Sequence, residues 1–242
     1  MGLDKNSKNI LVGKTIYAFG DSIVEGHAYT KASFVEFVAE QERMDAKKFA
    51  RNGATILPSD NHILSQLSLA PKEKPDYILF DGGTNDAYVE NVPRLGVVEV
   101  SFDSKDFNQS TFAGAFEHII CEMKRKWPDA HILYIAAHKM GMRDWKVQEL
   151  LHRLEMKICN KWKIPVVNLY EDTTLDTRED WQRKKYSFDV LGDDGLPGTE
   201  DTVATSDNKP TGTHPNIHGI KKFYVPAVTA ILHQLEKESD FL

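Results

Sequence analysis

Short apolar runs alternate with longer amphipathic segments along the whole chain. Four runs are typical of strands, at residues 15–19, 77–80, 131–136 and 165–169, and a shorter candidate lies at 48–50. Near-continuous apolar runs indicate strands that are buried on both faces, as in a parallel sheet. Apolar side chains recur at helical spacing in five further segments: 31–44, 61–69, 111–127, 142–162 and 216–236. Pro226 lies inside the last segment and predicts a kink there.

This alternation predicts an α/β fold that forms one domain over residues 1–242. The segment from 170 to 210 breaks the pattern, because it is long, acidic and without clear periodicity. We leave two interpretations open: a solvated surface excursion with a short helix near 178–185, or a lid that supplies substrate contacts. Asp193-Asp194-Gly195 could belong to a calcium site, but the spacing of the acidic residues does not match an EF-hand loop.

Residues with catalytic chemistry follow three of the predicted strands. Ser22 follows the first in Gly20-Asp21-Ser22, Gly53 follows the second, and Asn85 follows the third in Gly83-Thr84-Asn85-Asp86. His214 lies before the last helical segment. Each has an ordinary structural explanation as a turn or cap residue. The carboxyl ends of parallel strands share one edge of a sheet, however, so we expect these residues to meet there.

In this order the segments resemble the four blocks of the SGNH (GDSL-like) hydrolase family, and the resemblance spans about residues 14 to 235. It implies a three-layer α/β/α sandwich with a five-stranded parallel sheet in flavodoxin-like order. It also implies Ser22 as the nucleophile and His214 as its base. The implied oxyanion hole consists of the backbone N–H groups of Ser22 and Gly53 and the side-chain amide of Asn85.

The chemistry of these residue types fits the implied roles. A serine hydroxyl needs a neighbouring base to remove its proton, and a neutral imidazole can accept that proton near pH 7. His27, His62 and His138 are rival bases; His138 is the strongest of them, although it could instead line the pocket. We interpret Asp21 and Asp86 as structural residues whose carboxylates accept backbone N–H groups in their turns.

One position departs from the family pattern. The family usually has an Asp three residues before the His, and this chain has Thr211 there. We therefore predict a Ser22–His214 dyad, in which Nδ1 of His214 bonds to Thr211 or to a nearby main-chain carbonyl. The competing possibility is a carboxylate from the 170–210 segment, with Asp207 the nearest in sequence.

The resemblance implies hydrolysis of a carboxylic ester through an acyl-serine intermediate. Family members deacylate lipids, thioesters, small esters and O-acetylated sugars, and the polar, aromatic-bearing 170–210 segment favours a short acyl group on a carbohydrate. The alternative is a catalytically weak or inactive carbohydrate-binding or structural module, for instance of a phage tail or a polysaccharide system. Thr211 favours this alternative, whereas the presence of Ser22, Gly53, Asn85 and His214 together disfavours it.

Composition narrows the remaining possibilities. The 30 basic and 36 acidic residues give a net charge of −6, which argues against nucleic-acid binding. We expect no membrane partner, no secretory signal and a cytoplasmic location, because the chain has no h-region and no run of 18 apolar residues. We expect no cofactor or metal, since zinc motifs are missing and His214 and His218 lack a third ligand nearby. Cys121 and Cys159 are expected to be free thiols. The oligomeric state stays open.

Overall fold

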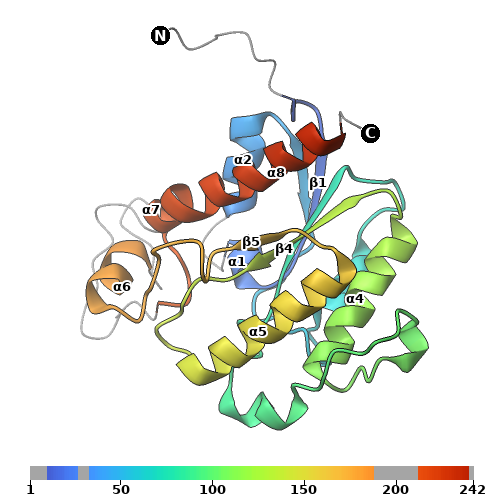
Figure 1. The fold of residues 1–242 in the computed structure, drawn as a ribbon. Coiled ribbons are helices and arrows are strands. Elements are labelled where there is room, and N and C mark those ends of the chain that lie inside the picture. The colour runs from blue at the N-terminus through green and yellow to red at the C-terminus, as the bar shows by residue number, and fades with distance from the viewer. Residues whose placement is uncertain (1–9, 27–32, 188–211, 240–242) are drawn as a thin grey trace, which may run out of the picture.

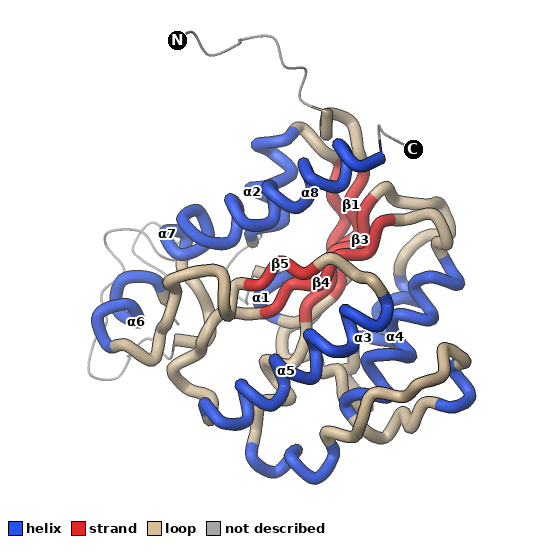
Figure 2. Tube along the Cα trace, viewed as in Figure 1, coloured by secondary structure: helices blue, strands red, loops and turns tan. Residues whose placement is uncertain are grey.

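A five-stranded parallel sheet forms the centre of the computed structural model, which describes residues 10–26, 33–187 and 212–239 (Figures 1 and 2). The sheet order is β2-β1-β3-β4-β5. The strands are β1 (Thr15–Phe19), β2 (Asp45–Lys48), β3 (Tyr77–Asp81), β4 (His131–Ala136) and β5 (Val166–Asn168). This is the flavodoxin-like order, so the predicted fold class is confirmed.

Helices cover both faces of the sheet (Figure 1). One face packs against α2 (Phe34–Glu42) and α8 (Val225–Ser239). The other packs against α3 (Ile63–Gln66), α4 (Phe112–Lys126) and α5 (Trp145–Trp162). The shorter elements are α1 (Ser22–Glu25), α6 (Asp180–Tyr186), α7 (Ile217–Gly219), the 3₁₀ turns Leu67–Leu69, Val89–Arg94 and Ser104–Asp106, and a π-helical turn at Ile220–Tyr224.

The strands divide their side chains between two cores. Tyr17 and Phe19 of β1 belong to the core under α3, α4 and α5, whereas Ile16 and Ala18 belong to the core under α2 and α8. Successive side chains of a strand point to opposite faces, so both faces of a central strand must be apolar. This explains the apolar runs that the sequence shows at β1, β3 and β4.

The second strand is displaced from its predicted position. We expected it at 48–50, but β2 is Asp45–Lys48 and pairs with β1 from Thr15↔Asp45 to Ala18↔Lys48. The first three residues of β2 are exposed, because this strand lies at the edge of the sheet with one neighbour. Edge strands tolerate charged side chains, so a search for apolar runs finds the wrong residues.

Helix ends follow the capping residues. Helix α2 begins after Ser33, which forms a capping box with Glu36, and α5 begins after Asp144 instead of at 142. The last helical segment is divided near Pro226: a π-helical turn at Ile220–Tyr224 leads into α8, whose second residue is Pro226. Pro226 has no N–H to donate to the preceding turn, and a wider turn is one way to accommodate this.

The 170–210 segment is described only in part. Its first portion contains α6 at Asp180–Tyr186, close to the short helix expected near 178–185. Residues 188–211 lie outside the described residues, so the lid interpretation and the Asp193-Asp194-Gly195 site stay untested.

Two further features of the described residues concern the cysteines and membrane spans. Cys121 and Cys159 are free thiols, as predicted. No helix within the described residues has the length and apolar character needed to cross a bilayer.

Gln66 fixes the point at which β1 leaves the sheet. The buried Gln66 side chain accepts a hydrogen bond from the Gly20 N–H (2.8 Å) and donates one to the Gly20 carbonyl (2.7 Å). Gly20 has φ +148°, and a Cβ there would lie 1.8 Å from Oδ1 of Asp81. Only glycine therefore fits at this position, directly before the Asp21-Ser22 turn.

We predict that Gln66→Leu lowers the free energy of unfolding by about 1–3 kcal/mol, because the buried Gly20 N–H loses its acceptor. Urea denaturation measures the change. Gln234→Leu, at an exposed position of α8, is the matched control and should change stability by less than about 0.5 kcal/mol. Equal effects of the two substitutions would contradict the role given to Gln66.

Candidate active site

Ser22 and His214 meet at the carboxyl-terminal edge of the sheet. Ser22 is the first residue of α1, and the preceding Asp21 caps this helix by accepting a hydrogen bond from the N–H of Ile23 (2.9 Å). The Ser22 Oγ lies 2.9 Å from Nε2 of His214, although the two residues are 192 positions apart in the sequence. This is hydrogen-bond distance, and it places an imidazole nitrogen beside a serine hydroxyl.

Three N–H donors that the sequence singled out belong to the segments that follow β1, β2 and β3. The backbone N–H of Ser22 belongs to the first turn of α1 and has no partner within the helix. Gly53 is exposed with φ +77°, and within the described residues nothing accepts a hydrogen bond from its N–H or from that of Ser22. The Asn85 side chain donates to the Ala54 carbonyl (2.9 Å). The same nitrogen lies 3.5 Å from Asp21, the outer limit for a hydrogen bond, so its second N–H is only weakly engaged.

Asp86 ties the loop after β3 to the loop after β2. Its buried carboxylate accepts hydrogen bonds from the N–H groups of Ile56 and Leu57, each at 2.9 Å. Burial raises the pKa of Asp86 to about 6, so at neutral pH the group is mostly ionised and able to accept both bonds. The expectation that Asp86 accepts backbone N–H groups is confirmed, both from Gly83 in its own turn and from the neighbouring loop.

Asp81 lies beneath the nucleophile turn. Its Oδ1 accepts a hydrogen bond from the N–H of Asp21 (2.9 Å), and both carboxyl groups are buried. Burial raises the pKa of Asp21, and burial together with the Asp21 carboxylate raises that of Asp81 well above its usual range. Two adjacent buried carboxylates repel each other, and this repulsion favours protonation of the pair.

His138, the strongest rival base, is engaged elsewhere. Its Nε2 donates to the Gly212 carbonyl (3.0 Å), which fixes the tautomer, and its Nδ1 accepts from the Tyr224 hydroxyl (2.7 Å). Burial lowers the pKa of His138 to about 4, so the ring is neutral. With both nitrogens occupied, it has no lone pair for the proton of Ser22. The same Gly212 carbonyl accepts a hydrogen bond from Thr177 (2.5 Å), so the chain is anchored two residues before His214.

The remaining candidates from the sequence are the other rival bases, the residues that could orient His214, and a metal site at His214 and His218. His62 is half-buried, with Nδ1 2.6 Å from the Ser59 carbonyl, and His27 lies outside the described residues. Thr211 and Asp207 also lie outside them, so the group that orients His214 stays a prediction. His218 is exposed, and within the described residues no cluster of His, Cys, Asp or Glu could hold a metal ion.

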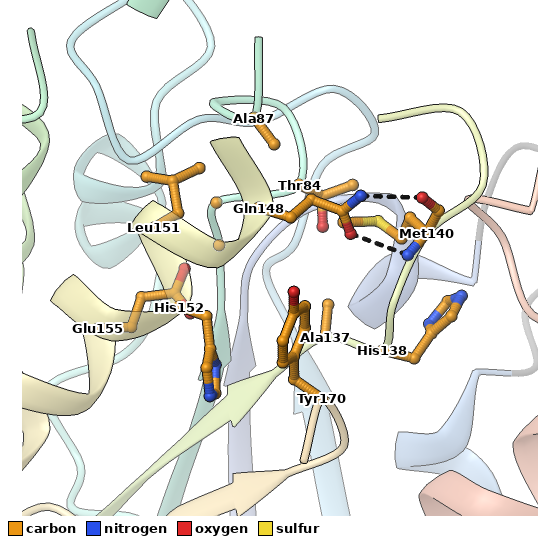
Figure 3. A pocket seen from close by; sticks show the side chains of 12 residues that line it. Thr84, Ala87, Ala137, His138, Met140, Gln148, Leu151, His152, Glu155 and Tyr170 are labelled. Carbon is orange, nitrogen blue, oxygen red and sulfur yellow. Dashed lines mark hydrogen bonds between the residues drawn. The ribbon is translucent and has the colours of Figure 1, made fainter. Parts of the chain in front are cut away.

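A pocket adjoins the loop that carries Asn85 (Figure 3). It encloses about 290 Å³, open solvent included, and its walls include Thr84, His138, Gln148, His152, Glu155 and Tyr170. Neither Ser22 nor His214 lines it. A Cβ at Gly83 would lie 2.5 Å from Oε1 of Glu155, and the Tyr134 hydroxyl donates to the Gly82 carbonyl (2.9 Å). Burial raises the pKa of Glu155 to about 8, so an uncharged acid supports this loop at neutral pH.

Several residues that shape the site escaped the sequence analysis. Gln66 is a polar residue within the short apolar stretch of α3, and Asp81 ends the apolar run of β3. A polar residue at such a position was the only signal available. Thr177 and the anchoring role of His138 depend on contacts across more than 30 residues, and no local pattern predicts those.

Similar folds occur in several solved structures. A possible lipase from Chitinophaga pinensis matches with a TM-score of 0.65 and 19% identity, over 91% of this chain and 98% of that one. A lipase/acylhydrolase from Enterococcus faecalis matches with a TM-score of 0.59 and 17% identity, over 93% and 96%. An active-site mutant of a family two carbohydrate esterase from Clostridium thermocellum matches with a TM-score of 0.56 and 17% identity, over 92% and 64%. At these identities the likeness concerns the fold.

Sequence comparison identifies the family. No curated protein matches the chain. The sequence model of the GDSL-like Lipase/Acylhydrolase family matches residues 18–221, a span that begins within β1 and ends in the π-helical turn before α8. This span contains Ser22, Gly53, Asn85 and His214, and it covers most of the 242 residues. The chain therefore belongs to the GDSL-like lipase/acylhydrolase family.

Proposed function

We propose that the protein hydrolyses a carboxylic ester through an acyl-Ser22 intermediate. The observation that carries this proposal is the 2.9 Å separation between Ser22 Oγ and His214 Nε2. The donors on Ser22, Gly53 and Asn85 support it, because acyl transfer needs stabilisation of an oxyanion beside the nucleophile. Membership of an acylhydrolase family supports it independently.

The geometry suggests how the reaction proceeds. His214 Nε2 takes the proton of Ser22 while Oγ attacks the acyl carbon, and the former carbonyl oxygen becomes an oxyanion. The N–H groups of Ser22 and Gly53 and the Asn85 amide donate to that oxygen. The intermediate collapses as protonated His214 passes its proton to the departing alcohol. A water molecule, deprotonated by His214, then attacks acyl-Ser22, and breakdown of the second intermediate releases the carboxylic acid.

A short acyl ester on a carbohydrate is the substrate that we favour. Trp181 on α6 is 60% exposed and packs edge-on against Tyr186. The exposed Trp181 ring offers an aromatic surface of the kind that sugar rings contact. The fold likeness to a carbohydrate esterase is consistent with this choice. The alternative, a binding or structural module with weak or no catalysis, is favoured by Thr211 in place of the family's Asp.

We predict that a fluorophosphonate probe forms a single adduct, on Ser22, and that Ser22→Ala abolishes p-nitrophenyl acetate hydrolysis. The reason is that Ser22 Oγ lies 2.9 Å from Nε2 of His214, which can take the hydroxyl proton as Oγ attacks. Intact-mass and peptide mass spectrometry locate the adduct. Labelling at another residue, or unchanged turnover in Ser22→Ala, would exclude the acyl-Ser22 mechanism, and no turnover by the wild type would favour the binding module.

We predict that Asn85→Ala lowers kcat by ~100- to 1000-fold with little change in KM, because the amide acts mainly on the transition state. Steady-state kinetics on p-nitrophenyl acetate separate the two constants. Asn91→Ala is the matched control, since Asn91 also donates to a carbonyl of this loop, that of Asp86 (3.1 Å), and it should change kcat by less than about threefold. A large rise in KM with intact kcat in Asn85→Ala would make Asn85 a ground-state binding residue.

We predict that Asp207→Asn lowers kcat by less than about tenfold, because an uncharged acceptor can hold the tautomer of His214. Loss of a catalytic acid in a complete triad costs ~10⁴ in kcat, so the same assay distinguishes the two arrangements. Thr211→Asp is the converse variant. A higher kcat in this variant would indicate that the site accepts the Asp that completes the catalytic triad in the family. A fall approaching ~10⁴ in Asp207→Asn would mean that the acid has moved to the 170–210 segment.

A further inference from the structure

Arg143 stands at the same sheet edge as the candidate catalytic residues. It lies in the loop between β4 and α5, and its Nε donates to the Thr84 carbonyl (2.8 Å). That carbonyl belongs to the peptide bond that joins Thr84 to Asn85. The guanidinium group is therefore bonded to the backbone directly beside the proposed oxyanion donor, although it is 58 positions away from Asn85 in the sequence.

The loop holds Arg143 in a fixed place. The buried Gln148 side chain donates to the carbonyls of Arg143 (3.1 Å) and Met140 (2.9 Å) and accepts from the Met140 N–H (2.8 Å). Figure 3 shows the paired bonds between Gln148 and Met140. The guanidinium itself lies 4.7 Å from the centroid of the Tyr88 ring. A planar group held at its Nε and on one face has lost most of its rotational freedom before any ligand arrives.

Within the described residues, no carboxylate forms an ion pair with the guanidinium group of Arg143. No Asp or Glu there lies within ion-pair distance of the guanidinium. The neighbouring Asp144 is engaged in capping α5, where its Oδ1 accepts from the N–H groups of Lys146 and Val147.

The Nη1 and Nη2 groups of Arg143 thus remain as a half-buried, oriented fork of N–H donors. Such a fork matches the two oxygens of a carboxylate, and the match provides both charge and geometry. The lack of an acidic partner for Arg143 is notable because the chain has more acidic than basic residues and a net charge of −6. A surface cation kept only for solubility would need neither the Thr84 carbonyl nor the Tyr88 ring to hold it.

We propose that Arg143 forms an anion subsite beside the oxyanion hole and selects esters that carry a carboxylate near the scissile bond. The inference rests on the proposed ester hydrolysis for the location of the scissile carbonyl. It deepens that function by naming the substrate class, an acidic ester such as an acylated uronate-type sugar or hydroxy acid. Arg143 acts here as a specificity-determining residue and takes no part in proton transfer.

The test compares esters that differ only in a carboxylate. Values of kcat/KM are measured for phenyl acetate and for 3- and 4-acetoxybenzoate, with the wild type, Arg143→Met and Arg153→Met. Arg153 pairs with Glu149 on the exposed side of α5, so its removal changes the net charge equally but away from the loop. We expect Arg143→Met to lower the acetoxybenzoate-to-phenyl-acetate ratio by about tenfold or more, and Arg153→Met to leave the ratio in place. The wild-type ratio should fall as ionic strength rises.

A ratio that is unchanged in Arg143→Met overturns the inference. So does an equal loss on all three esters, because Arg143 would then act only by holding the Thr84 loop. Arg143→Lys, which keeps the charge without the fork, should fall between the wild type and Arg143→Met.

A binding measurement separates this inference from the proposed function. Isothermal titration of 3- and 4-acetoxybenzoate into Ser22→Ala and into Ser22→Ala/Arg143→Met requires no turnover. A dissociation constant about tenfold weaker in the double variant supports the anion subsite, even if the wild type hydrolyses no ester and the proposed function fails. Equal affinities, or no binding to either variant, overturn the subsite even if esterase activity is present.

Discussion

Buried carboxyl groups hold three loops together beneath the candidate nucleophile, and the geometry of the site depends on them. Asp81 accepts the N–H of Asp21, so the end of β3 positions the turn that presents Ser22. Asp86 accepts the N–H groups of Ile56 and Leu57, so the loop after β3 also positions the loop that contains Gly53. Neighbouring parallel strands place these loops side by side, and the carboxyl groups help to fix their distances.

These acids can remain buried because they differ in protonation. Asp86 accepts two N–H groups and has a pKa of about 6, so it is charged at neutral pH. Asp81 faces Asp21, and burial together with this like charge raises its pKa well above the usual range. Glu155, with a pKa of about 8, supports the same loop from α5 as an uncharged acid. The site therefore combines several buried acidic side chains, and burial raises the pKa of each of them.

The sheet could be predicted from the sequence because its central strands are buried on both faces and read as apolar runs. The edge strand β2 could not, because it pairs with only one strand and its exposed polar residues form no apolar run. Ser22, Gly53 and Asn85 could be noticed because each lies a few residues after a strand, but their roles and the pairing of Ser22 with His214 came from the family resemblance. The supports Gln66, Asp81 and Thr177, and the engagement of His138, depend on side-chain contacts between distant segments, which no local pattern records.

If Ser22, His214 and the three N–H donors form one acyl-transfer site, a covalent phosphonate adduct should occupy all of them in a crystal structure. The account predicts phosphorus bonded to Oγ of Ser22, with one phosphonate oxygen within about 3 Å of the N–H nitrogens of Ser22 and Gly53 and of Nδ2 of Asn85. His214 Nε2 should remain beside Oγ. An adduct whose oxygen points away from these three donors, or a phosphonate attached to another residue, would contradict the account.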